Sequence, residues 1–181
     1  MSNIAPLLDR NRAFASDPDA RRDSPAIPFI PNLSLYIVTC IDSRVDPAQI
    51  LGIRLGEAVV QRNIGGRITP ANIADIAYIA YLVETKAPEG PYFELAIIHH
   101  TDCGSTLLAE DDLRHGFARR IGVDERTLAD TPVLDPARTV ATDVNRVLWA
   151  QEIPRAVRVS GHVYDVDTGL VTTVVDAQGK E

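Results

Sequence analysis

The 181-residue sequence has little of several things that define other protein classes. It holds two cysteines, and its 18 basic residues against 25 acidic ones give a net charge of −7. So few cysteines exclude a disulfide-rich scaffold. The acidic balance argues against nucleic acid or an anionic membrane as a partner, because both favour a basic face. No stretch of this sequence approaches the roughly 18 apolar residues of a membrane span.

The N-terminal stretch 1–11 also lacks the basic and apolar regions of a signal peptide. We therefore expect a cytoplasmic protein, in which a stable disulfide between the two cysteines would be unusual. The hydrophobic share of 45% is that of a globular chain with a substantial core. We expect one domain over residues 35–181, preceded by an N-terminal helical arm and linker over 1–34.

Strand-like and helix-like segments alternate through most of the chain. The arm begins with a predicted amphipathic helix over 4–15, followed by a Pro-rich linker over 17–31. Expected strands lie at 35–39, 58–62, 93–98 and from 157, with a turn at 167–169 into a last strand at 170–175. Expected helices run from Asp46-Pro47 to 51, from Thr69-Pro70 to 85, over 105–120, and from Asp135-Pro136 to 150.

This order predicts an α/β fold with a mostly parallel central sheet flanked by helices and ending in a C-terminal hairpin. In such a sheet the functional site lies at the carboxyl ends of the strands, where the strand order reverses. Cys40 follows the first expected strand, and His100 and Cys103 follow the third. A 2-1-3 strand order would make these strands neighbours and bring the three side chains together.

Two thiolates and one imidazole are ligands that Zn²⁺ prefers, and three protein ligands leave a position for water or substrate. His99 and His100 face opposite sides of a strand, and the spacing to Cys103 favours His100 as the ligand. The dipole of the helix expected after Gly104 would favour a thiolate at Cys103. The alternative is a pair of buried, unreactive thiols.

Asp42 and Arg44 follow Cys40 closely enough to belong to the same site. Taken alone, an Asp-x-Arg sequence is often a solvated ion pair. Beside a metal, Asp42 has two further interpretations: it is a fourth ligand, or it pairs with Arg44 and accepts a hydrogen bond from metal-bound water.

Three ordered motifs resemble the β-class carbonic anhydrases, and the compact bacterial branch in particular. They are Cys40-Ile41-Asp42-Ser43-Arg44, Arg62-Asn63-Ile64-Gly65-Gly66 and His100-Thr101-Asp102-Cys103-Gly104. The resemblance implies Zn²⁺ bound by Cys40, His100 and Cys103, with Asp42 and Arg44 as the catalytic pair. It also implies a homodimer, or a dimer of dimers, with active sites near the subunit interface.

The activity implied is that of a zinc lyase, which reversibly hydrates CO₂ to bicarbonate through zinc-bound hydroxide. The same branch also resembles hydrolases of carbonyl sulfide and carbon disulfide, which keep the zinc site. A non-catalytic zinc-binding relative, with Asp42 locked onto the metal, is a further alternative. Pocket walls rather than these motifs decide between CO₂ and its sulfur analogues.

The remaining candidates have simpler interpretations. We expect His115 and His162 to be structural or solvated, and His99 to be packed or to relay protons. We expect Asn63, Gly65 and Gly66 to shape the loop beside the pocket. Trp149 and the tyrosines are expected in the core or an interface. The apolar stripe of the arm and the helix over 69–85, which is apolar almost all round, are the expected dimer contacts.

Overall fold

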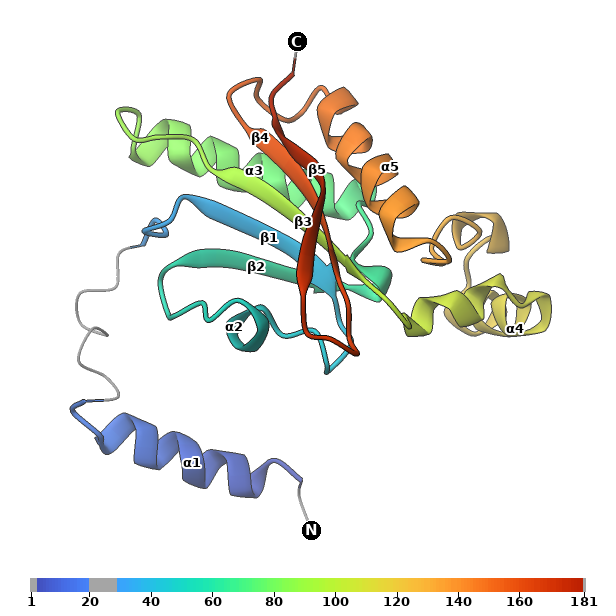
Figure 1. The fold of residues 1–181 in the computed structure, drawn as a ribbon, viewed down its shortest axis with the longest axis horizontal. Helices are drawn as coiled ribbons and strands as arrows, with labels where there is room; N and C mark the ends of the chain where they lie inside the picture. The colour runs from blue at the N-terminus through green and yellow to red at the C-terminus, as the bar shows by residue number, and fades with distance from the viewer. Residues whose placement is uncertain (1–2, 20–28, 181) are drawn as a thin grey trace.

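The computed structural model describes residues 3–19 and 29–180 of the chain. Its centre is one five-stranded sheet in the order β2-β1-β3-β4-β5 (Figure 1). The first four strands in this order are parallel, and only the β4–β5 pair is antiparallel. The expected α/β class, the 2-1-3 neighbours and the C-terminal hairpin are therefore confirmed. The strands are β1 (Leu35–Cys40), β2 (Ala58–Asn63), β3 (Glu94–His100), β4 (Arg158–Tyr164) and β5 (Val171–Gln178).

Helices cover the sheet unequally. The long helices α3 and α5 pack on one face, where their side chains join those of the strands in the larger core cluster. The short helix α2 lies over the other face with a smaller cluster (Figure 1). The helices are α1 (Ala5–Ser16), α2 (Pro47–Ile50), α3 (Pro70–Lys86), α4 (Asp111–Ile121) and α5 (Pro136–Trp149), with 3-10 turns η2 (Ile64–Gly66), η3 (Gly104–Ala109) and η4 (Glu125–Thr127).

Three helices begin where the sequence predicts, because each has a capping side chain followed by proline. Asp46 accepts a hydrogen bond from the backbone of Ala48, and Asp135 accepts one from Arg138. Thr69 forms a reciprocal capping box with Asn72 at the start of α3. Proline at the first helical position has no N–H that needs a partner there.

The prediction of a single helix over 105–120 is wrong. The segment forms the 3-10 turn η3, then an extended residue at Glu110, then α4. Ser105 is held by Val133, whose backbone N–H donates to its hydroxyl at 3.1 Å, so the first turn follows that contact. Asp111 and Asp112 then give α4 an acidic first turn, which favours a new helix N-terminus.

Although its sequence is apolar almost all round, α3 is buried on one face only within this chain. Its buried residues lie on one face, whereas Tyr78 and Tyr81 are 60% and 61% exposed. Trp149 is 84% exposed, so the core alternative for it is wrong and the interface alternative stays a prediction. A surface tryptophan at a helix end has the same sequence pattern as a buried one, which is why the sequence did not separate the two.

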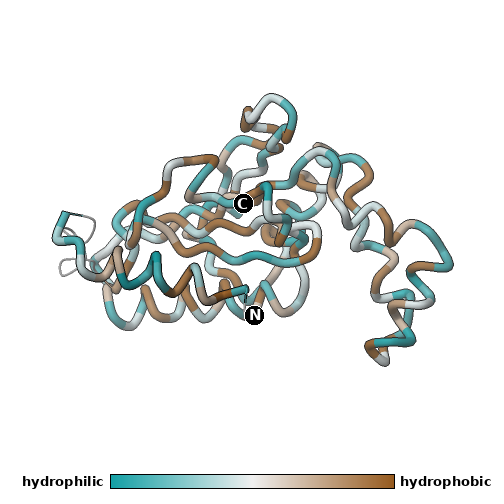
Figure 2. Tube along the Cα trace, turned by 90° about the horizontal axis from the view of Figure 1, so that it is seen from below, coloured by the Kyte–Doolittle hydropathy of each residue, from teal (hydrophilic) through white to brown (hydrophobic). Residues whose placement is uncertain are grey.

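The helix expected in the arm forms as α1, and this helix contributes nothing to the core. None of the residues in α1 is buried, and its apolar side chains are exposed. Figure 2 shows polar and apolar residues mixed along this helix, while apolar residues run along the central strands. Much of the linker predicted over 17–31 lies outside the described residues. No helix in the described part of the chain is long and apolar enough to cross a membrane.

Candidate metal centre

Parallel pairing of β1 with β3 brings the two cysteine motifs together. Thr39 lies opposite Ile98 in this pairing, so both strands end at the same edge of the sheet. Cys40 is the last residue of β1, and His100 is the last residue of β3. One ligand atom each from Cys40, His100 and Cys103 lies within 4.8 Å of the others, and all three residues are buried. The two sulfur atoms are 3.9 Å apart and both cysteines are free.

His100 has one nitrogen available for a ligand. Its Nδ1 lies 2.8 Å from the carbonyl oxygen of Thr101, which can only accept, so Nδ1 carries the proton. Its Nε2 then carries a lone pair, and this nitrogen is buried without a hydrogen-bond partner. A buried unpaired acceptor is costly. A metal ion between this nitrogen and the two sulfurs removes that cost, and the backbone hydrogen bond orients the ring as metal-bound histidines require.

The two thiols are not equivalent. A hydrogen bond from Cys40 and another from Ser105, whose Oγ is 3.1 Å from the sulfur, lower the pKa of Cys103 to about 6. The same contact between the cysteines, together with burial, raises the pKa of Cys40 to about 12. The hydrogen bond between the two sulfurs requires one of them to carry a proton. A soft divalent cation replaces that proton and allows both thiolates to form.

Ser105 is a residue of the site whose role the sequence did not predict. Its Oγ accepts a hydrogen bond from Val133 N, which leaves the hydroxyl proton free to point at Cys103 Sγ. The segment after Cys103 is a six-residue 3-10 turn and not the expected α-helix. The hydrogen bond from Ser105 therefore stabilises the thiolate in place of the helix dipole that the sequence predicted. The one signal in the sequence for a hydrogen bond from Ser105 to Cys103 is that the two residues are two positions apart.

The glycine pair behind the cluster permits a close approach between β1 and η2. Gly66 has a φ of +66°, and a Cβ there would lie 2.9 Å from the backbone carbon of Thr39 and 3.0 Å from Cys40 N. No larger residue fits in that space. Asn63 fixes the same turn, because its Nδ2 donates to the carbonyl oxygen of Arg67 and to Asn72. These residues shape the loop, as expected.

Asp42 lies beside the cluster and faces Arg44. The guanidinium donates from Nε to Oδ1 at 3.0 Å and from Nη2 to Oδ2 at 2.7 Å, which is a bidentate pair. These hydrogen bonds hold the pKa of Asp42 well below its usual range. Of the two arrangements considered above, the carboxylate adopts the one paired with Arg44. Arg62 supports the loop by donating to the carbonyl oxygens of Cys40 and Asp42.

An apolar cavity opens beside the cluster. It has a volume of about 670 Å³, and Cys40 and Asp42 are among the residues that line it. Its walls are mainly aliphatic and aromatic side chains from the two motif loops, η3 and α4: Ile41, Ile64, Leu107, Leu108, Leu113 and Phe117. Such a cavity suits a small uncharged molecule better than a charged one.

His99 faces the opposite side of the sheet and has a packed, hydrogen-bonded role. Its Nδ1 lies 2.8 Å from Thr139 Oγ1, and its Nε2 lies 3.2 Å from Asp143 Oδ2. His115 pairs with Glu125 on the surface, and His162 contacts the hydroxyls of Ser160 and Thr173. None of these three histidines belongs to the metal-type cluster found among the described residues.

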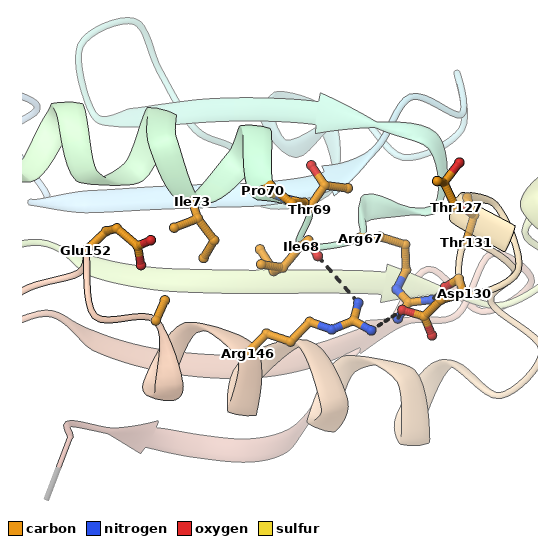
Figure 3. Close-up of a pocket in the computed structure, with 11 residues that line it drawn as sticks. Arg67, Ile68, Thr69, Pro70, Ile73, Thr127, Asp130, Thr131, Arg146 and Glu152 are labelled. Atoms are coloured by element: carbon orange, nitrogen blue, oxygen red, sulfur yellow. Dashed lines mark hydrogen bonds and ion pairs between the residues drawn. The ribbon is translucent and has the colours of Figure 1, made fainter. Parts of the chain in front are cut away.

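Another cavity, of about 500 Å³, lies on the α5 side of the sheet, between α3 and α5. Figure 3 shows Arg67 and Arg146 reaching Asp130 at its wall. Arg67 and Arg146 also contact the buried Asp143, so the two cations are balanced by two carboxylates. Balanced charge favours a structural network over a binding site for an anion.

Comparison with known proteins agrees with the motifs. A family model described as carbonic anhydrase matches residues 35–122, which contain the three motifs. β-Carbonic anhydrase 1 of Mycobacterium tuberculosis is 30% identical over 148 residues, or 82% of this chain and 86% of that protein. The chain belongs to the β-class carbonic anhydrase family. Carbonic anhydrase of Streptococcus mutans superposes with a TM-score of 0.75 at 30% identity, covering 96% of this chain and 98% of that one.

Family membership leaves the reaction open. A carbon disulfide hydrolase of Saccharolobus solfataricus is 30% identical over 164 residues, covering 77% of this chain and 76% of that protein. Two kinds of named activity therefore occur among relatives of similar identity. The family and the Cys-His-Cys cluster together indicate a metal-dependent enzyme scaffold.

Proposed function

We propose that the protein is a zinc-dependent carbonic anhydrase that reversibly hydrates CO₂ to bicarbonate. The observation that carries this proposal is the buried Cys40–His100–Cys103 cluster next to the Asp42–Arg44 pair. Two sulfurs and one imidazole nitrogen are a donor set for zinc, and a catalytic site needs no fourth protein ligand, because water or substrate takes that position. β-Carbonic anhydrases among the relatives support the same reaction.

Each part of the site has a distinct task. A zinc ion held by Cys40, His100 and Cys103 would activate water as a nucleophile near neutral pH. Asp42, kept ionised by Arg44, can accept one hydrogen bond and so orient the attacking group. The apolar walls hold CO₂ and keep bulk water away from it.

Hydrolysis of carbon disulfide is the second candidate. The cavity is lined mainly by apolar side chains, which suit CS₂ as well as CO₂, although Asp42, Ser105 and Arg120 also line it. A hydrolase of that substrate is among the relatives at 30% identity. The two linear molecules differ mainly in size, so the dimensions of the cavity mouth would decide between them.

Stopped-flow CO₂ hydration, run beside sulfide release from carbonyl sulfide and carbon disulfide, tests the proposal. We expect CO₂ hydration far above the buffer rate, and no sulfide release above that of the metal-free protein. Sulfide release without CO₂ hydration would assign the protein to the hydrolases. The absence of both activities in the zinc-loaded protein would favour a non-catalytic relative.

Replacing Asp42 by asparagine is expected to retain zinc and lower kcat about tenfold to a hundredfold. An amide keeps the size of the carboxylate but cannot hold a negative charge or pair bidentately with Arg44. The matched control is Asp124→Asn, because Asp124 and Arg126 form an exposed pair with the same spacing, remote from the cluster. Near-parental turnover of Asp42→Asn between pH 6 and 9 would exclude a catalytic part for this carboxylate.

We also propose that the functional unit is a homodimer held partly by α1. The helix exposes Ile4, Leu7, Leu8 and Phe14 at 39–56% each, and apolar surface of this kind usually packs against something. α3 offers a further exposed face with Tyr78 and Tyr81. A helix such as α1, which has no buried residue on its own chain, is better suited to packing on a second one.

Deleting residues 1–17 is therefore expected to shift a dimer toward monomer. Light scattering at micromolar concentration, with the full chain beside the deletion, measures the change. Leu7→Ser with Leu8→Ser keeps the chain length and should act in the same direction, because it removes apolar area only. An active monomeric full chain at micromolar concentration would contradict the dimer proposal.

A further inference from the structure

Arg44 has a second carboxylate partner in addition to Asp42. Its Nη1 donates to Asp102 Oδ2 at 2.7 Å, and its Nη2 donates to the carbonyl oxygen of Asp102 at 2.9 Å. The guanidinium thus lies between two carboxylates and uses Nε, Nη1 and Nη2 in hydrogen bonds to them and to one carbonyl. Asp42 belongs to the loop after β1, whereas Asp102 belongs to the loop after β3. Arg44 therefore joins the loop that follows Cys40 to the loop that contains Cys103.

The backbone at Asp102 is adapted to this contact. Its φ is +51°, in the left-handed region that non-glycine residues seldom adopt, although aspartate and asparagine enter it more readily than others. Cys103 follows directly, so the turn that aims the sulfur at the cluster also presents Asp102 to Arg44. A residue held in a sparsely populated conformation needs contacts that keep it there. The two hydrogen bonds from Arg44 are such contacts.

The second partner matters because Arg44 is open to solvent. The arginine side chain is 45% exposed and that of Asp102 is 77% exposed, whereas that of Asp42 is 15% exposed. A guanidinium held by one carboxylate at the surface exchanges readily with water. With Asp102 on the other side of Arg44, the plane of the guanidinium is held from two directions. The guanidinium in turn holds the carboxylate of Asp42.

We propose that Asp102 is a positioning residue that holds Arg44 against Asp42 and so keeps the Asp42 carboxylate turned away from the metal. The inference rests on the proposed function only in assigning Asp42 to the reaction. The positioning itself is a property of the Asp42–Arg44–Asp102 triad. Without Asp102, Arg44 leaves Asp42 more often, and a free carboxylate beside a cation turns toward it.

Two substitutions separate the charge of Asp102 from its backbone conformation. Asp102→Gly accepts the left-handed φ without strain and removes the carboxylate. Asp102→Asn also tolerates that φ and keeps an oxygen that can accept from Arg44, but it loses the charge. We expect kcat to fall about three- to tenfold in Asp102→Gly and less in Asp102→Asn, the sizes typical of a partly exposed charged hydrogen bond. Asp124→Asn is the control and should keep parental kcat.

The decisive measurement is a double-mutant cycle with Arg44→Ala. If Asp102 acts through Arg44, Asp102→Gly changes nothing further in the Arg44→Ala background. The cycle is read twice, as kcat for CO₂ hydration and as the visible absorption spectrum of the Co²⁺-substituted protein, which reports the ligands of the ion. We expect Asp102→Gly to shift the spectrum toward that of Arg44→Ala.

The outcomes are distinct. A parental spectrum and kcat in Asp102→Gly would overturn the proposal, because Arg44 would then need no second partner. A loss of equal size in the parental and Arg44→Ala backgrounds would also overturn it, since Asp102 would then act on the fold of its own loop. If the parent protein does not hydrate CO₂, the proposed function fails, yet the spectral cycle still decides the role of Asp102.

Discussion

Cys40→Ala and His100→Ala proteins are expected to purify almost free of zinc, whereas the parent chain holds about one zinc per chain. Each substitution leaves two of the three ligand side chains in the cluster. Zinc binding to a complete site of this kind contributes on the order of 10 kcal/mol, so the loss of one ligand lowers the affinity by several powers of ten. Elemental analysis after dialysis against a weak chelator measures the zinc content.

His115→Ala is the matched control for the histidine, because His115 is exposed and pairs with Glu125 away from the cluster. It should keep the parental zinc content. With two cysteines in the whole chain, no other thiol can take the place of Cys40. Full zinc occupancy in Cys40→Ala would therefore exclude the assignment of these ligands, whatever the activity of the protein.

The parts of the site that the sequence predicted depend on local signals and strand order. Asp-Pro and Thr-Pro pairs marked the starts of three helices, and apolar runs marked the strands between them. Once β1 and β3 are neighbours, the ends of both strands must meet, and so must Cys40 and His100. Parallel alternation of strands and helices has few alternative topologies, which is why this inference was possible.

The parts that the sequence did not predict depend on contacts between distant segments. The role of Ser105 depends on its hydrogen bond with Val133, which lies 28 residues further along the chain. The role of Asp102 depends on its hydrogen bond with Arg44, which lies 58 residues before it. Ser105 has the local pattern of an ordinary loop serine, and the motif that contains Asp102 does not indicate which side chain it contacts. The break before α4 has the same cause, because a contact outside the segment fixes its first turn.

Asp143 is the clearest example of a residue whose role depends on contacts between distant segments. Its side chain is fully buried, and its two oxygens accept from Arg67 Nε at 2.7 Å, Arg146 Nη1 at 2.8 Å and the backbone N–H of Ile68 at 3.2 Å. His99 approaches the same carboxylate. Arg67 and Ile68 directly follow the glycine pair that packs against Cys40. The network therefore ties α5 to the loop behind the metal cluster.

Replacing Asp143 by alanine is expected to lower the free energy of unfolding by about 3–5 kcal/mol, because it leaves the buried Arg67 without the nearer and more buried of its two carboxylate partners. Asp143→Asn should lose less, since an amide oxygen still accepts from one arginine. Asn145→Ala, an exposed change on the same helix, is the control and should stay within about 0.5 kcal/mol of the parent. Denaturant unfolding at equal zinc content and protein concentration measures all three.

The pH dependence separates the charge of Asp143 from its packing. Burial opposes ionisation of this carboxyl, but hydrogen bonds from His99 and Arg67 outweigh it and lower its pKa in the folded protein. A carboxyl with a lowered pKa stabilises the fold at pH values above its unfolded pKa of about 3.9, and that contribution is lost as the pH falls toward the folded value. The difference between parent and Asp143→Asn should therefore be constant from pH 6 to 8 and shrink below about pH 4. A difference that does not change with pH would show that the network acts through shape alone, with Asp143 contributing no net charge interaction.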